Sequence, residues 1–310
     1  MSQYLIRRRA FLQSLSTSAG VLLARRNGLA ASQAPDFEKI FKDIRANLLE
    51  MVNEERAVAK LPVLARDELA EQVATAHAVD MATADFASHW GRNGLKPYQR
   101  YSFAGGTHAT QENVSAADNT WSTKVADLKQ DTAYLHVRLY QEQPPNDGHR
   151  RTILAPQHTH VGFGLAIEKL RLRLVELFVA KYVDVKSLER TAKPGAQILF
   201  EGRMLHSEYR LTFVEVFYET LPKPPALSWL QEARSYSLPD ESRVLRPKLE
   251  LPLIYADKTP GIIDVMPDGS FVAPVTLFNP EPGIYTIVAW IKHGKTEKAF
   301  PATEVCIRAE

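Results

Sequence analysis

Apolar residues change their spacing partway along the chain, from a helical period to that of strands. Over residues 37–52 they recur every three or four positions, as one face of an amphipathic helix requires. A second helix is predicted after Asp67, a suitable N-cap beyond the helix-breaking Pro62, and a third within residues 121–143. The polar, glycine-rich stretch from residue 91 to about 119 has weak periodicity and is predicted to be a loop.

Strand patterns follow the proline pair at residues 144–145. Residues 160–167 and 170–185 are rich in β-branched and alternating apolar side chains, which predicts an antiparallel pair of strands. Helices first and strands late, with polar loops between them, predict an α+β domain over residues 36–187.

The helical pattern almost disappears beyond SLERTAKPGAQ (residues 187–197), which is predicted to be a linker. Short apolar runs bounded by Pro, Gly, Asn and Asp predict an all-β domain over residues 195–310, a sandwich of short strands. It has no polar cluster with catalytic spacing, so a structural or binding role is expected. The aromatic residues predicted to lie in its core are Phe213, Phe217, Tyr285 and Trp290.

The first 33 residues have the pattern of an export signal. An arginine cluster precedes a moderately apolar segment and then small residues, and RRAFL at residues 8–12 resembles the twin-arginine signal of bacterial export. An ordinary secretory signal is the alternative. No later run of about 18 apolar residues exists, so a periplasmic or extracellular protein that is not integral to the membrane is expected.

Charge and cysteine content indicate which partners and which covalent cross-links this chain is expected to lack. Residues 1–33 carry five arginines and no acidic residue, so the basic balance of the chain comes from this segment. Nothing in the remainder favours nucleic acid or an anionic membrane surface as a partner. The single cysteine, Cys306, allows no internal disulfide, and it is predicted to be a strand residue.

Four segments of the first domain carry polar residues that could meet in a cleft. They are SHWGRNGLKPYQR with His89, QENVS with Glu112, YQEQPP with Glu142, and DGHRRTIL with His149. The Asp-Gly turn before His149 is expected to place it in the first turn of a short helix, where Arg150 and Arg151 pair with carboxylates or orient the loop. Taken singly, each residue also has an ordinary structural explanation.

The order of these motifs resembles the CAP superfamily of cysteine-rich secretory proteins, antigen 5 and pathogenesis-related proteins. The resemblance covers residues 40–185 and depends on five motifs in order: NEER in one helix, SHW after the next helix, then EN, GHR and VGFG. It is closest to the disulfide-free bacterial members with an SCP domain. The resemblance implies a three-layer α-β-α sandwich with a cleft. The cleft would gather His89, Glu112, Glu142 and His149, with Asn113, His136 and Arg150 as supporting residues. Glu142 lies closer to the GH loop than its counterpart in disulfide-rich members, and His136 could also face the cleft.

Two imidazoles and two carboxylates suit zinc or another divalent cation. Three functions stay open. The first is a binding protein for a cation, a lipid or another small ligand, whose β domain docks to a cell-envelope partner. The second is a metal-dependent hydrolase with Glu112 or Glu142 as general base, and the third is a structural role in which the four residues form a hydrogen-bonded network. No HExxH, no GxSxG and no cysteine occur in the first domain, which counts against an enzyme.

Overall fold

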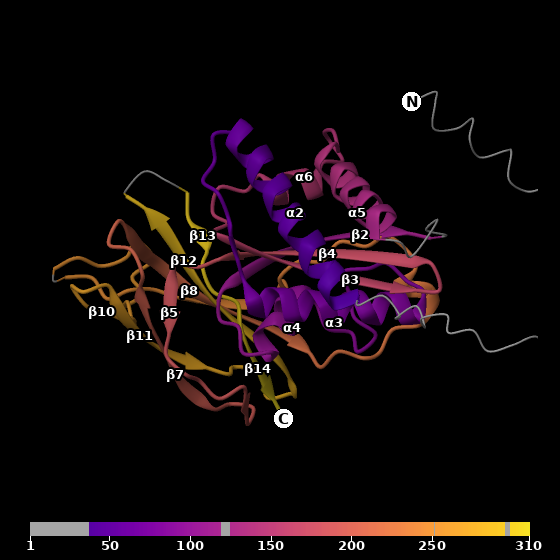
Figure 1. Cartoon of the computed structure of the whole chain (residues 1–310). Helices are drawn as coiled ribbons and strands as arrows, with labels where there is room; N and C mark the ends of the chain where they lie inside the picture. The colour runs from indigo at the N-terminus through magenta and orange to yellow at the C-terminus, as the bar shows by residue number, and fades with distance from the viewer. Residues whose placement is uncertain (1–36, 119–124, 251, 295–297) are drawn as a thin grey trace, which may run out of the picture. The chain divides into compact units, whose positions relative to one another are not determined.

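The computed structural model describes residues 37–118, 125–250, 252–294 and 298–310 (Figure 1). The export signal predicted for residues 1–33 lies outside the described residues. Among the helices that are described, none has the length and apolar character needed to cross a membrane.

A four-stranded sheet forms the centre of the first part of the chain. Its strands lie in the order β1, β3, β4, β2, with bounds Ala65–Arg66, His160–Glu168, Arg171–Ala180 and Ala109–Ala117. β3 and β4 pair antiparallel, as their apolar pattern predicts, and β2 pairs antiparallel with the other edge of β4.

Helices cover both faces of this sheet, as Figure 1 shows for α2 and α3 on opposite sides of β3 and β4. One face shares a core with helices α2 (Phe37–Val58), α5 (Val125–Tyr140) and α6 (Gly148–Ile153). The other face packs against α3 (Glu68–Ala84), whose N-cap is Asp67 as predicted. The predicted three-layer α-β-α arrangement is therefore confirmed. The third predicted helix begins at residue 125 in the described chain, and residues 121–124 lie outside it.

Two glycines of β3 set the distance between α3 and the sheet. A Cβ atom on Gly162 would lie 2.2 Å from the backbone nitrogen of Glu71, and one on Gly164 would lie 2.1 Å from the backbone carbonyl carbon of Ala74. Both distances are far below van der Waals contact. The VGFG motif therefore lets the backbone of α3 lie directly on the strand.

The loop predicted for residues 91–119 is wrong, because this stretch contains helix α4 (Pro97–Phe103) and strand β2. α4 is too short to show a period, and it starts with proline at its first position, where no backbone donor is needed. β2 buries Glu112, Asn113 and Ser115, which are polar residues. Glu112 is held there by His89 and Arg100, and the side-chain nitrogen of Asn113 donates to Glu176, contacts that an apolar-spacing argument does not detect.

The second part of the chain is a β-sandwich, as predicted. One sheet has the order β10 (Asp264–Val265), β11 (Ser270–Thr276), β7 (Gln197–Met204), β5 (Val183–Val185). The other has the order β6 (Thr191–Ala192), β14 (Val305–Ala309), β12 (Gly283–His293), β8 (Tyr209–Thr220), β9 (Ser242–Leu245), with β13 (Phe300–Pro301) beside β12. A short helix, α7 (Leu227–Leu230), lies between β8 and β9.

The two sheets enclose one apolar core that includes Phe200, Phe271 and Tyr285. Of the other aromatic residues expected there, Phe217 is buried, while Phe213 and Trp290 are half-buried and stack on each other. Cys306 is fully buried in β14, and burial raises the pKa of its thiol to about 12. It is the strand residue that the sequence predicts.

The α-β-α part and the sandwich meet along β2, and residues 37–310 form one compact unit. The backbone amide of Ala109 donates to the carbonyl of Ala302 at 3.1 Å. Glu304, which is buried, accepts hydrogen bonds from the amide and the hydroxyl of Thr110, at 2.8 and 3.2 Å. The expected linker also takes part in the fold, because β6 within it pairs with β14.

Replacing Glu304 with glutamine is expected to remove part of the pH dependence of stability. Burial raises the pKa of Glu304 from 4.5 to about 8. The folded-state pKa is above the unfolded one, so the contribution of this carboxyl is fully present below pH 4.5 and is lost as the pH rises through 8. The melting temperature of Glu304→Gln should therefore exceed that of the parent by about 5 °C at pH 9, and by less at pH 5. Thermal scans at pH 5, 7 and 9 measure this difference.

Glu208→Gln, at an exposed position of the same sandwich, is the matched control and should follow the parent at every pH. Parallel curves for the parent and Glu304→Gln would show that Glu304 does not hold its proton in the folded state.

Candidate functional site

His89 and Glu112 form the first of two His–Glu pairs. His89 lies in the turn after α3, Glu112 lies in β2, and the ring Nδ1 is 3.0 Å from Glu112 Oε1. Arg100 of α4 donates from Nη2 to Glu112 Oε2 at 2.6 Å and from Nη1 to the carbonyl of His89 at 2.7 Å. Burial raises the pKa of Glu112, but Arg100 and the nearby histidines outweigh it and lower the pKa to about 2. Glu112 is therefore an ionised, fully engaged carboxylate at neutral pH.

Glu142 and His149 form the second pair. Glu142 lies two residues beyond the end of α5, and His149 is the second residue of α6, in the position that the Asp147-Gly148 turn predicts. Glu142 Oε1 lies 2.6 Å from His149 Nδ1, and its Oε2 accepts the backbone amide of His149 at 3.0 Å. One carboxylate thus fixes both the ring and the start of the helix.

The two pairs face each other, so the structure brings together all four residues singled out in the sequence. The ring centroids of His89 and His149 are 6.1 Å apart, with 35° between the ring planes. Each Nδ1 is engaged by its own glutamate, and no described residue hydrogen-bonds to either Nε2. The His149 side is more open: the side chains of His149 and Glu142 are 33% and 24% exposed, against 15% and 1% for His89 and Glu112.

His136 does not join the four residues, because it is enclosed between two acidic side chains. Its Nδ1 lies 2.6 Å from Glu176 Oε1 in β4, and its Nε2 lies 3.1 Å from Glu55 Oε2 in α2. Burial lowers the pKa of His136, but the two glutamates outweigh it and raise the pKa to about 10. The ring is therefore a buried imidazolium at neutral pH.

Asn113 connects this buried group to the second pair. Its Nδ2 donates to Glu176 Oε2 at 3.1 Å and to the backbone carbonyl of His149 at 3.2 Å. Glu55 and Glu176 are therefore part of the site's support, although they were not among the predicted residues. Glu55 belongs to the NEER motif, and Glu176 is a lone acid within an apolar strand, which is the sequence signal that could have identified it.

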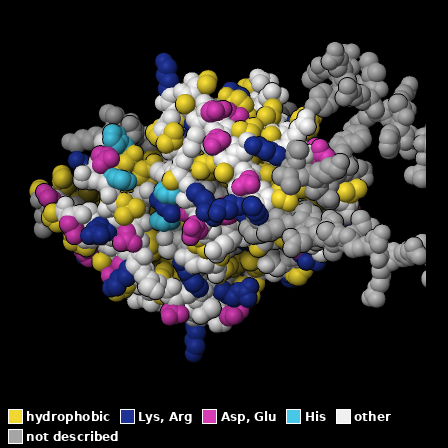
Figure 2. Space-filling view, in the orientation of Figure 1, with side chains coloured by type: hydrophobic (Ala, Val, Ile, Leu, Met, Phe, Trp, Pro, Cys, Tyr) yellow, Lys and Arg dark blue, Asp and Glu magenta, His cyan; other side chains and the backbone are white. Residues whose placement is uncertain are grey.

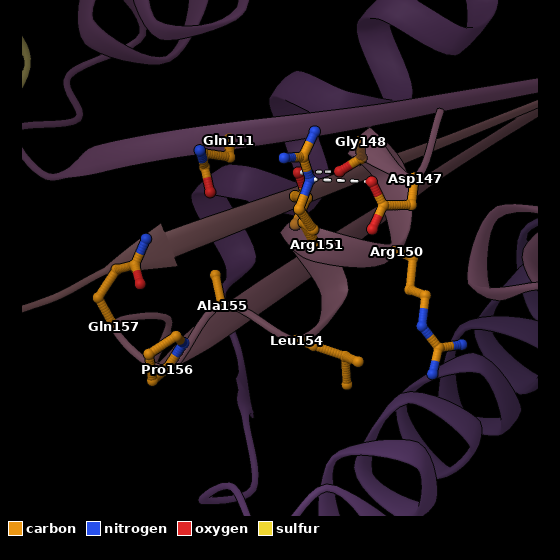
Figure 3. A pocket seen from close by; sticks show the side chains of 10 residues that line it. Gln111, Asp147, Gly148, Arg150, Arg151, Leu154, Ala155, Pro156 and Gln157 are labelled. Carbon is orange, nitrogen blue, oxygen red and sulfur yellow. Dashed lines mark hydrogen bonds and ion pairs between the residues drawn. The ribbon is translucent and has the colours of Figure 1, made fainter. Parts of the chain in front are cut away.

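Arg150 and Arg151 orient the loop that carries His149. Arg150 donates to the carbonyl of Tyr140 at 2.6 Å and lies over the Tyr140 ring at 4.3 Å, so it pairs with no carboxylate in the described chain. Arg151 pairs with Asp147 at 3.3 Å. Beside them is an open hollow of about 620 Å³, which Figure 3 shows between Gln111, Arg151 and Gln157. Neither of the two His–Glu pairs lines this hollow, so it is a separate feature.

Tyr236, from the sandwich part, completes the surroundings of the first pair. Its hydroxyl accepts the backbone amide of Glu112 at 2.8 Å, and its ring packs edge-to-face against His89 with centroids 5.0 Å apart. No motif surrounds this residue, and it follows Glu112 by 124 positions. The sequence pattern gives no signal that would place it here.

His89 and His149 are the residues of this site that could serve as nitrogen ligands of a divalent cation. Across the described ranges, no group of three or more His, Cys, Asp or Glu side chains is placed to hold a metal ion together. Each histidine, however, has its Nδ1 on a carboxylate, the arrangement that fixes the tautomer and direction of a metal-binding imidazole. In this geometry Glu112 and Glu142 orient the histidines, and solvent would supply the remaining ligands that zinc requires.

Residues 49–182 match the model of the CAP family, described as the cysteine-rich secretory protein family. One similar solved structure is an extracellular protein containing an SCP domain from Bacillus anthracis, at 21% identity and a TM-score of 0.36, covering 48% of this chain and 45% of that chain. Another is an outer surface protein from Borrelia burgdorferi, at 18% identity and a TM-score of 0.36, covering 47% of this chain and 95% of that one. The present chain thus spans less than half of the Bacillus chain. No curated protein matches it.

Proposed function

Since residues 49–182 form a CAP domain, we propose that this protein is an exported binding protein that holds a divalent cation, zinc first of all, between His89 and His149. The observation that carries the proposal is the pairing of each ring Nδ1 with its own glutamate while the two rings lie 6.1 Å apart. Such carboxylate contacts raise the basicity of an imidazole ligand and fix its direction.

The same geometry argues against the hydrolytic alternative. A general base needs a carboxylate oxygen that can take a proton from water near neutral pH. Glu112 has one oxygen on His89 and the other on Arg100, and its pKa is lowered to about 2. Both oxygens of Glu142 are engaged by His149. Binding without turnover is therefore the function that these contacts favour.

Location and partners belong to the same proposal. The arginine-rich first segment supports export to the periplasm or the cell exterior of a bacterium. Figure 2 shows basic and acidic side chains interspersed on the face drawn. A small ligand or lipid at the cation site and a cell-envelope partner for the sandwich complete the proposal.

A calorimetric titration of the chelator-treated full chain with zinc tests the cation site. We expect binding of one zinc ion per chain, and at least a hundredfold weaker binding in His89→Ala and in His149→Ala, because each change removes one of two nitrogen ligands. His206→Ala, which removes an exposed histidine of the sandwich, is the control and should bind like the parent. Failure of the parent to bind zinc, or unchanged binding in both site variants, would contradict the proposed site.

A further inference from the structure

A segment of the sandwich lies against the first His–Glu pair. It comprises residues 229–237, between β8 and β9, and is called the covering segment below. Near its start the Trp229 ring packs edge-to-face on Trp90 with centroids 5.5 Å apart, and Gln231 donates to the carbonyl of Asp85 at 2.9 Å. These contacts attach the covering segment to the turn that carries His89.

The covering segment is also attached on both sides of Tyr236. Trp90 Nε1 donates to the carbonyl of Ser235 at 3.4 Å, and Lys96 Nζ donates to the carbonyl of Ser237 at 3.2 Å. Lys96 is itself buried and pairs with Glu219 of β8 at 2.8 Å. Tyr236 is thereby held from both neighbours, and its position depends on contacts between the CAP domain and the sandwich.

Tyr236 contacts both members of the first pair. Its hydroxyl accepts the Glu112 amide at 2.8 Å, and its ring covers one side of His89. The hydroxyl fixes the backbone of β2 at the residue whose carboxylate orients His89.

We propose that Tyr236 is a positioning residue of the cation site, so that the sandwich sets the affinity with which His89 and His149 hold zinc. This inference rests on the proposed function and adds to it a residue from outside the matched family region, which ends at residue 182. Tyr236 acts through Glu112 and does not itself ligate the cation. Partners hydrogen-bonded directly to metal ligands change metal affinity by about 10- to 100-fold when they are removed, and the Tyr236 hydroxyl acts one contact further out, so an effect at the low end of this range is expected.

Tyr236→Phe tests the inference in the full chain, because it keeps the ring and removes only the hydroxyl. We expect calorimetry to show about tenfold weaker zinc binding, with the melting temperature of the zinc-free protein changed by less than about 3 °C. In the zinc-free protein, hydrogen exchange of the Glu112 amide should become faster. Tyr255→Phe is the control, since it removes a tyrosine hydroxyl that contacts only the carbonyl of Pro247 among the described residues.

Each outcome decides between the two proposals. Zinc affinity equal to that of the parent in Tyr236→Phe would overturn the role of Tyr236 and leave the cation site intact. A lower melting temperature with unchanged zinc affinity would do the same, since it would show a structural role alone. If the parent binds no zinc, the proposed function fails first and the role of Tyr236 fails with it.

Discussion

Replacing His136 with alanine is expected to lower the free energy of unfolding by about 3–5 kcal/mol, because it leaves one buried and one half-buried carboxylate without their cation. Glu176 is fully buried, and Glu55 is 15% exposed at its side chain. Both lose their imidazolium partner at once. Thermal unfolding of the variant should occur about 10 °C below that of the parent at pH 7.

The destabilisation caused by His136→Ala should be smaller at high pH. The folded-state pKa of His136 is about 10, above its ordinary value of 6.5, so its contribution is fully present below pH 6.5 and is lost as the pH rises through 10. The difference in melting temperature between parent and His136→Ala should accordingly be larger at pH 7 than at pH 10. His206→Ala provides the matched control. A loss below about 1 kcal/mol at pH 7 would show that Glu55 and Glu176 do not depend on His136.

Placing a methyl group at Gly164 should cost about 3 kcal/mol or more, since the new Cβ would lie 2.1 Å from backbone atoms of Ala74. Backbone atoms cannot move aside as a flexible side chain can, so α3 must shift away from β3. We expect Gly164→Ala to melt about 10 °C below the parent and amides of α3 to exchange faster.

Gly148→Ala is the control for this change, because a Cβ at Gly148 would meet no atom within 4 Å. It should alter the melting temperature by no more than about 2 °C. A similar small change in Gly164→Ala would mean that α3 does not lie on β3 as closely as described.

Periodicity and motif order predict much of this molecule, each for a physical reason. The third predicted helix and the β3–β4 hairpin bury apolar stripes, and such stripes leave a period in the sequence. The sequence identifies His89, Glu112, Glu142 and His149, because each belongs to a short motif and the order of these motifs resembles a family. The structure then places these four side chains in two facing pairs.

The features that the sequence does not predict depend on contacts between distant parts of the chain. The apolar pattern does not reveal β2 because most of its buried residues are polar. Glu55 and Glu176 resemble solvated acids until His136 is placed between them. Tyr236 reaches the site only through tertiary contacts of the covering segment. Partners of this kind are set by the three-dimensional fold, and local spacing does not encode them.

The neighbouring residues Glu112 and Asn113 serve opposite faces of one strand, and this limits how the chain can change in length. Glu112 meets His89 on one side, and Asn113 meets Glu176 and His149 on the other. Inserting or deleting one residue within β2 would exchange the two faces. One such change would remove the Glu112 carboxylate from His89 and the Asn113 side-chain amide from the carbonyl of His149. Length variation between relatives of this protein should therefore collect in loops and spare β2.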